Sequence, residues 1–253
     1  MLLPGPIGSA FAMRHIARAL SDSGRHVVII DPLGMGASSR SKHADYALSA
    51  QARRVHRAID TVLPTNASFV VAGAGTSATI ALHLAANMPD RVQGVVSIAG
   101  GGNDTQGTTG LRLALALSPL LDTPMGRAFA RRRFASTARA QSADASWVTS
   151  ASVAGYLGDA ERDVRGTLST LQRMADSQEP QPIGPRLPTI EAPVVLLVGD
   201  KPKVSSPMSA QRLALAGGLR QFRIDTLVGA GAMLHEERPR DIVAHLVRLG
   251  PKP

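Results

Sequence analysis

The sequence contains no cysteine. Disulfide bonds and thiolate metal sites are therefore excluded, and the absence fits a reducing compartment, so we expect a cytoplasmic protein. Aromatic residues make up only 3% of the chain, against 44% hydrophobic residues in all. Ala, Leu and Val must consequently do most of the core packing.

Long apolar runs are also missing. No segment approaches the roughly 18 consecutive apolar residues that a membrane span needs. The N-terminus shows no basic region followed by an apolar run and a cleavage site, which would mark a signal peptide. We therefore expect neither a membrane partner nor a secretory leader.

Acidic residues are in the minority: 19 Asp and Glu stand against 28 Lys and Arg, a formal net charge of +9. Such an excess can indicate binding to nucleic acid or to an acidic surface, and that binding would weaken strongly with salt. The basic residues are mostly scattered arginines, with one dense cluster at Arg131–Arg133 and no interleaved aromatics. We favour a solvated surface and expect no nucleic-acid partner.

What the 253 residues do contain is an alternation of buried-type strands and amphipathic helices. The predicted strands are residues 1–4, 26–31, 69–73, 92–99, 193–198 and 222–227. The predicted helices between and after them are residues 11–24, 46–63, the run around Ile80, Leu82 and Leu84, and residues 209–215 and 239–249. This alternation predicts a mostly parallel, doubly wound α/β sheet with helices on both faces.

The alternation stops from about Leu111 to Gln178, where the chain is helical in character and rich in Ala and Arg. A proline-rich stretch, Pro180–Pro188, precedes its return. We therefore expect residues 1–104 and 189–253 to form one core, and residues 105–188 to form a helical lid inserted between two strands.

The stretch Ser68–Ala86 organises the chain, because it is predicted to be a strand, a tight turn and a helix. This is the layout of a nucleophile elbow, where a Ser normally stands exposed on the turn. Here the nucleophile position falls on Gly75. A competing interpretation is a phosphate-binding G-x-G-x-x-[GA] turn at Gly73, Gly75 and Ala78. It is weaker, because the next strand ends in glycines rather than in an acidic residue.

Several motifs in order give the chain a resemblance to the α/β-hydrolase superfamily over nearly its whole length. They are the strand end Leu2–Pro6, the D-x-x-G-x-G-x-S loop Asp31–Ser38, the helix and exit Ala81–Val92, Gly199–Asp200 and Gly229–Gly231. The resemblance implies an α/β-hydrolase fold whose first strands are missing or shortened. The strand His26–Asp31 would then be an unprotected edge. Either the chain start is set too late, or a partner, for example a second copy in a homo-oligomer, covers that edge.

The resemblance implies a Ser, an acid and a His in that order, and the aligned positions lack all three. The nucleophile position is Gly75, the acid position is Lys201 or Pro202, and the base position is Ala232. Losing the Ser or the His alone costs such an enzyme roughly 10⁶-fold in rate. We therefore expect no serine-hydrolase mechanism of the usual kind.

The implied oxyanion hole is also incomplete. One donor maps to Pro6, which has no backbone N–H, and only the donor at Thr76 remains. Loss of one such donor costs about 10²- to 10³-fold.

Neighbouring polar residues offer a displaced alternative. Ser77 and His235 could replace the missing pair, but small residues at the elbow usually pack against the strand, so Ser77 is expected to point into that packing. His235 precedes Glu236 and Glu237, and a helix-entry role or a contact with these acids is favoured. Asp104 could serve as an acid only with a base to orient.

The remaining titratable residues fit structural roles. Asp31 is interpreted as fixing its loop, and His15, His56 and His83 as packed or surface residues of helices. Their spacing predicts no metal site, and we expect no cofactor.

These observations favour a hydrolase-like protein that binds a small apolar molecule in the former active-site pocket. The predicted ligand-binding residues are Pro6, Ile7, Gly75, Thr76, Ala232 and Met233. Two alternatives stay open: a non-hydrolytic enzyme such as a cyclase, isomerase or lyase, and an active ester hydrolase that uses Ser77 and His235.

Overall fold

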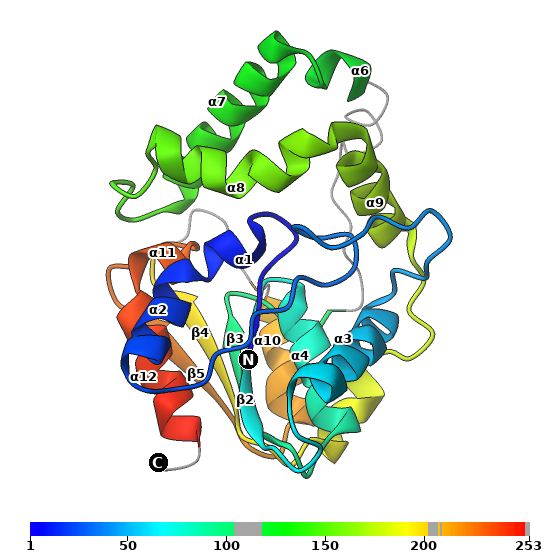
Figure 1. The fold of residues 1–253 in the computed structure, drawn as a ribbon. Helices are drawn as coiled ribbons and strands as arrows, with labels where there is room; N and C mark the ends of the chain where they lie inside the picture. The colour runs from blue at the N-terminus through cyan, green and yellow to red at the C-terminus, as the bar shows by residue number, and fades with distance from the viewer. Residues whose placement is uncertain (104–117, 202–206, 208, 251–253) are drawn as a thin grey trace.

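A five-stranded parallel sheet forms the centre of the computed structural model (Figure 1), which describes residues 1–253 except 104–117, 202–206, 208 and 251–253. The strands lie side by side in chain order. They are β1 (Leu2–Leu3), β2 (Phe69–Ala74), β3 (Val92–Ile98), β4 (Val194–Gly199) and β5 (Phe222–Leu227). All four pairings are parallel, which confirms the predicted fold class.

Strands β2 and β4 carry no charged or polar side chain, in keeping with the cover on both of their faces. Every residue of β2 and of β4 is buried, as expected for strands between two layers of helices. At the outer edge, β5 is only half-buried.

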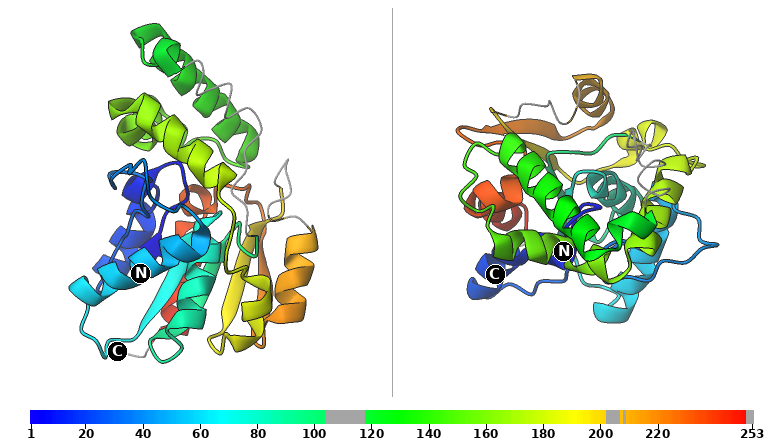
Figure 2. Two further views of the ribbon diagram at one scale, coloured as in Figure 1. Left: turned by 90° about the vertical axis from the view of Figure 1, so that its right-hand side faces the viewer. Right: turned by 90° about the horizontal axis from the view of Figure 1, so that it is seen from above.

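Helices cover both faces of the sheet (Figures 1 and 2). Apolar side chains of the first layer form one core cluster with the sheet. The elements of this layer are α2 (Arg14–Asp22), α11 (Leu234–Glu237) and α12 (Pro239–Leu249), and the short helix α1 (Ser9–Ala12) precedes α2. The second layer forms the larger cluster. Its elements are α3 (Leu48–Val62), α4 (Ser77–Asn87), α10 (Ser209–Gly218) and the 3₁₀ helix η1 (Gly184–Thr189).

Four further helices among the described residues lie between β3 and β4 in the chain and stand over the carboxyl ends of the strands (Figure 2). They are α6 (Ser118–Leu121), α7 (Pro124–Gln141), α8 (Ser150–Arg162) and α9 (Val164–Asp176). The start of α8 is stabilised by a capping box, in which Thr149 and Ser152 satisfy each other's backbone N–H groups.

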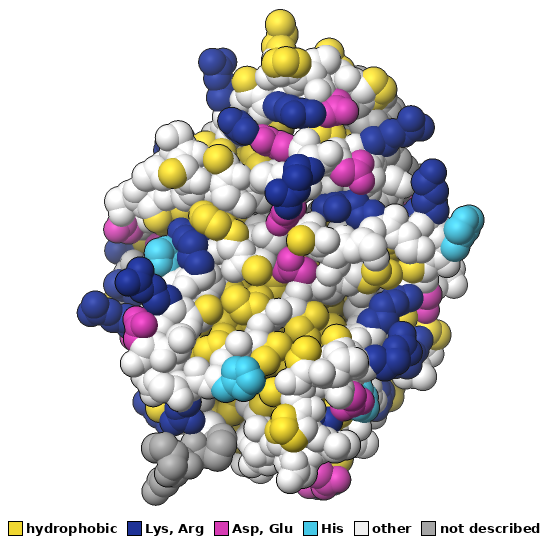
Figure 3. All heavy atoms as spheres, viewed as in Figure 1, with side chains coloured by type: hydrophobic (Ala, Val, Ile, Leu, Met, Phe, Trp, Pro, Cys, Tyr) yellow, Lys and Arg dark blue, Asp and Glu magenta, His cyan; other side chains and the backbone are white. Residues whose placement is uncertain are grey.

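The segment His26–Asp31 differs from the prediction of a fully buried strand. It pairs with β1 through a single parallel bridge between Leu2 and Ile29, and its four apolar side chains are half-buried. The reason is its place at the edge: β1 offers only two residues to pair with. Hydrophobic side chains gather at the middle of this face of the molecule (Figure 3). That a partner covers this edge stays a prediction.

The first predicted helix is also divided in two. Helix α1 ends at Ala12, and α2 begins at Arg14 after the non-helical Met13. Within α2, Ile16 and Leu20 are buried as predicted, whereas the side chain of His15 is 49% exposed. None of the described helices is long and apolar enough to cross a bilayer.

Two Gly→Ala substitutions should change stability in opposite directions. A Cβ at Gly100 would lie 2.2 Å from the carbonyl oxygen of Gly75, so Gly100→Ala forces backbone apart and should lower the free energy of unfolding by about 1–3 kcal/mol. A Cβ at Gly158, inside α8, meets nothing within 4 Å. Gly158→Ala should therefore raise the free energy of unfolding by about 0.5–1 kcal/mol. Urea titration measures the free energy of unfolding of both variants. Equal effects of the two substitutions would contradict the close contact of Gly100 with the backbone of Gly75.

Candidate functional site

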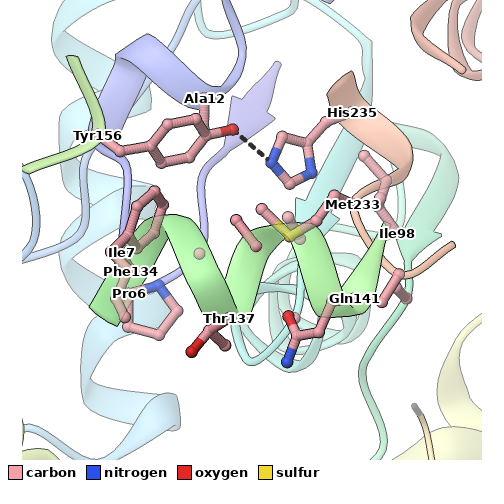
Figure 4. A pocket seen from close by; sticks show the side chains of 16 residues that line it. Pro6, Ile7, Ala12, Ile98, Phe134, Thr137, Gln141, Tyr156, Met233 and His235 are labelled. Carbon is pink, nitrogen blue, oxygen red and sulfur yellow. Dashed lines mark hydrogen bonds between the residues drawn. The ribbon is translucent and has the colours of Figure 1, made fainter. Parts of the chain in front are cut away.

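A cavity of about 460 Å³ lies at the carboxyl edge of the sheet, beneath α7 and α8 (Figure 4). In parallel sheets this edge is where ligands bind, because the loops after all the strands converge there. Most of the lining is apolar. The lining residues come from the loops after β1, β2, β3 and β5 and from helices α1, α7, α8 and α11: Gly5, Pro6, Ile7, Ala12, Ala74, Gly75, Ile98, Ala99, Phe134, Thr137, Ala138, Gln141, Tyr156, Ala232, Met233 and His235.

The turn between β2 and α4 keeps the geometry of an elbow. Gly75 has a φ of +56°, the left-handed conformation that favours glycine, and its N–H donates to the Ile98 carbonyl at 3.0 Å. A Cβ at this position would meet nothing within 4 Å. The turn therefore has room for a side chain directed at the cavity, and the chain places none there.

The aligned base position opens onto the same cavity. Ala232 is a lining residue, and its N–H donates to the carbonyl of Gln141 at 2.8 Å. At the acid position, Lys201 donates its N–H to Ala230, and Pro202 lies outside the described residues. The preceding Asp200 accepts a bond from the Gly229 N–H at 2.8 Å, so its carboxylate joins two loops.

The structure brings five of the six predicted ligand-binding residues together. Pro6, Ile7, Gly75, Ala232 and Met233 all line the cavity. The sixth does not line it.

That sixth residue is Thr76, at the start of α4. Its hydroxyl oxygen is buried and has no hydrogen-bond partner among the described residues. Whether any of the six contacts a ligand stays a prediction.

Ser77 does not face the cavity. It is fully buried, and its hydroxyl donates to the carbonyl of Pro4 at 2.6 Å. Its structure thus agrees with the packing role expected of a small residue at the elbow. No hydrogen bond joins Ser77 to His235 in the part of the chain that the structure describes.

His235 is instead the end of a buried polar chain, which we call the His235 chain. Its Nε2 lies 2.8 Å from the hydroxyl of Tyr156, and that hydroxyl lies 2.5 Å from Oε1 of Glu236. Arg14 binds both oxygens of Glu236, at 2.6 and 2.8 Å. The chain joins α2, α8 and α11 and ends at the cavity wall (Figure 4).

Burial controls the ionisation of this chain. It lowers the pKa of His235 to about 4, although the negative charge of Glu236 acts in the opposite direction. Burial, together with the charge of Glu236, raises the pKa of the Tyr156 hydroxyl. Both groups are therefore neutral near pH 7.

An aromatic cluster holds Tyr156 in place. Its ring lies 5.5 Å from Phe11, 5.3 Å from Phe134 and 5.7 Å from Trp147, measured between centroids. The Arg14 guanidinium lies 4.0 Å from the centroid of the Phe11 ring. Four of the eight aromatic residues of the chain thus belong to this cluster.

The sequence analysis missed Tyr156, Phe134 and Arg14. The one available signal was composition, because the chain has only two Tyr and one Trp, and one of each falls in the helical stretch. The contact of Arg14 with Glu236 joins residues 222 positions apart, which no local pattern reveals.

The other titratable residues have structural surroundings. Asp31 accepts a hydrogen bond from the Ala37 N–H, as its predicted loop-fixing role requires, and Asp104 lies outside the described residues. His56 approaches Asp60 at 3.5 Å on the surface of α3, and His83 is fully buried in α4. No cluster of potential metal ligands occurs among the residues that the structure describes.

Comparison with known proteins supports one family. A model described as the alpha/beta hydrolase family matches residues 1–246. A comparison with curated protein sequences finds no match.

Solved structures resemble the chain over almost its whole length. A probable hydrolytic enzyme of Pseudomonas aeruginosa has a TM-score of 0.77 and 16% identity, over 99% of this chain and 84% of that one. A meta-cleavage product hydrolase of Pseudomonas fluorescens has a TM-score of 0.72 and 15% identity, over 98% and 88%. A thermophilic esterase of Thermogutta terrifontis has a TM-score of 0.69 and 16% identity, over 96% and 86%. At these identities the likeness establishes the fold alone.

The low pKa of His235 should make the protein less stable in acid. As the pH falls through about 6.5, His235 gains a proton in the unfolded chain, while the folded protein stays unprotonated there until about pH 4. The free energy of unfolding should therefore fall by roughly 2–3 kcal/mol between pH 7 and pH 4.5 on account of this group. The variant His235→Gln should lose that part of the pH dependence, and His43→Gln, at an exposed position, should keep it. Urea titrations at the two pH values measure this, and the same pH dependence in His235→Gln as in the wild type would contradict the burial of a neutral imidazole.

Proposed function

Because the chain belongs to the alpha/beta hydrolase family, we propose that it uses the family's pocket to bind a small apolar molecule without the family's usual serine chemistry. One observation carries this proposal. Gly75 lies on an elbow-like turn that lines an open cavity, and it has no side chain that could attack a substrate.

The surroundings of Gly75 support the same conclusion. Ala232 lines the same cavity at the aligned base position. Neither Gly75 nor Ala232 has a side chain that can attack a substrate or transfer a proton. Pro6 lines it as well and has no N–H to offer an oxyanion. Ser77 is engaged with Pro4 and cannot substitute without leaving its buried position.

The lining favours an apolar ligand. Pro6, Ile7, Ile98, Phe134 and Met233 present hydrocarbon or thioether surface to the cavity. Burying about 200 Å² of apolar ligand surface contributes roughly 5 kcal/mol before the entropic cost of association. A volume of about 460 Å³ is in the range of small-molecule sites.

In this proposal the helical stretch within residues 105–188 acts as a lid on the core formed by residues 1–104 and 189–253. Phe134 and Thr137 on α7 and Tyr156 on α8 form the roof of the cavity. A ligand beneath them would be screened from water on the side facing away from the sheet.

A fluorophosphonate probe tests the absence of serine chemistry. The purified protein should not be labelled covalently under conditions in which an active serine hydrolase in the same tube is labelled fully, because no activated hydroxyl faces the cavity. Intact-mass spectrometry measures the label. A serine modified in the native protein, and not in the heat-denatured control, would overturn this part of the proposal.

Binding of Nile red, a neutral dye whose emission rises in apolar surroundings, tests the pocket. The wild type should bind it saturably, and Ala232→Trp should weaken binding at least tenfold by filling the cavity. Ala210→Trp, at an exposed position of α10 away from the cavity, is the matched control and should bind as the wild type does. Thermal melting confirms that both variants are folded. Equal affinities of the two variants would show that the dye binds elsewhere and would contradict the proposal.

A further inference from the structure

The proton positions in the His235 chain follow from its chemistry. Arg14 donates to both oxygens of Glu236, and a carboxylate paired in this way can only accept further hydrogen bonds. The Tyr156 hydroxyl, 2.5 Å from Oε1, must therefore donate its single proton to Glu236. Its oxygen is then left as an acceptor toward His235.

That constraint selects one tautomer of His235. The Nε2 atom lies 2.8 Å from the Tyr156 oxygen, so it must carry the proton and donate it. Because burial keeps the imidazole neutral, with its pKa lowered to about 4, the other nitrogen carries no proton. Nδ1 consequently holds a free lone pair.

This lone pair is unused within the part of the chain that the structure describes. Nδ1 lies on the side of the ring away from Tyr156 (Figure 4), and no described residue forms a hydrogen bond with it. His235 lines the cavity, whose other nearby surfaces, Ile98 and Met233, are apolar. Nδ1 is not among the buried atoms that lack a partner, so it is accessible from the cavity. A ligand that fills the cavity displaces water from this acceptor, and a ligand able to donate a hydrogen bond avoids the cost of leaving it unpaired.

We propose that the cavity binds a neutral apolar molecule that carries a hydroxyl or N–H group, and that Nδ1 of His235 accepts the hydrogen of this group. The proposal rests on the proposed function and names the class of ligand for that same site. An anion is disfavoured, because Nδ1 of the neutral imidazole has no proton to donate to it, and the charge of Arg14 is already paired with Glu236. A ligand with acceptors alone leaves Nδ1 unpaired.

A matched pair of ligands separates hydrogen-bond donation from apolar burial. 2-Naphthol and 2-methoxynaphthalene share one ring system, but only the first can donate a hydrogen bond. The methyl ether is the more apolar molecule, so burial alone would make it bind more tightly. If Nδ1 accepts the hydroxyl hydrogen, 2-naphthol should instead bind about tenfold more tightly, the factor that corresponds to about 1.4 kcal/mol. Displacement of Nile red at pH 7 measures both affinities.

Variants locate the preference at His235. His235→Leu removes the acceptor and should abolish the preference while the ether still binds. Tyr156→Phe keeps the ring packing but removes the group that fixes the tautomer, so the preference should shrink. The matched controls are His43→Leu, at an exposed position, and Tyr46→Phe, whose hydroxyl bonds the Ser41 carbonyl away from the cavity. Both controls should keep the wild-type ratio of affinities.

A measurement on the wild type keeps the test independent of how the variants fold. The ¹⁵N chemical shift of Nδ1 should move upfield when 2-naphthol is added, as an unprotonated nitrogen does on accepting a hydrogen bond, and should not move in this way with the ether.

The outcomes distinguish the two proposals. If both ligands bind and the ether binds as tightly as the naphthol, the assignment of Nδ1 as an acceptor is overturned and the apolar pocket stands. If Nile red binds in the cavity and neither ligand displaces it, the ligand class is overturned and the apolar pocket stands. If Nile red itself does not bind in the cavity, the proposed function fails, and the ligand class fails with it.

Discussion

The carboxylate of Glu236 has no exposed surface, and a charge buried in this way costs several kcal/mol unless it is paired. Arg14 on α2 pairs with it through two hydrogen bonds, and Tyr156 on α8 supplies a third. Removing any one donor would leave a buried charge incompletely satisfied. The three helices must therefore meet at this point, which fixes α8 over the carboxyl edge of the sheet and defines one wall of the cavity.

At the cavity, the backbone geometry does not depend on the side chains that could react with a substrate. The turn at Gly75, the close backbone contact at Gly100 and the buried Ser77 together fix how strand β2, the turn and helix α4 pack. Gly75 and Ala232 line the cavity, and neither has a side chain that could attack a substrate or move a proton. Backbone geometry depends on small residues and hydrogen bonds, whereas catalysis depends on a few side chains, so the first can persist without the second.

Much of the fold could be predicted because its elements have strong local signals. The strand Phe222–Leu227 and the helix Pro239–Leu249 have the predicted bounds, and β2 differs from its prediction by one residue. The prediction failed for His26–Asp31, because an apolar run indicates a buried strand only if neighbouring strands cover it. Thr76 illustrates the same difficulty at the site. Its position next to Gly75 suggested the cavity wall, but the turn into α4 directs it elsewhere.

The sequence by itself determined the order of most strands and helices and the parallel sheet. These depend on periodicity and on spacing within a few residues, which the chain displays directly. Only the tertiary structure decided that Arg14, Glu236, Tyr156 and His235 form one hydrogen-bonded chain beside a cavity. The physical reason is that a buried charge needs a partner close to it in space, whatever the distance along the chain. The partner of Glu236 lies 222 positions away in the sequence.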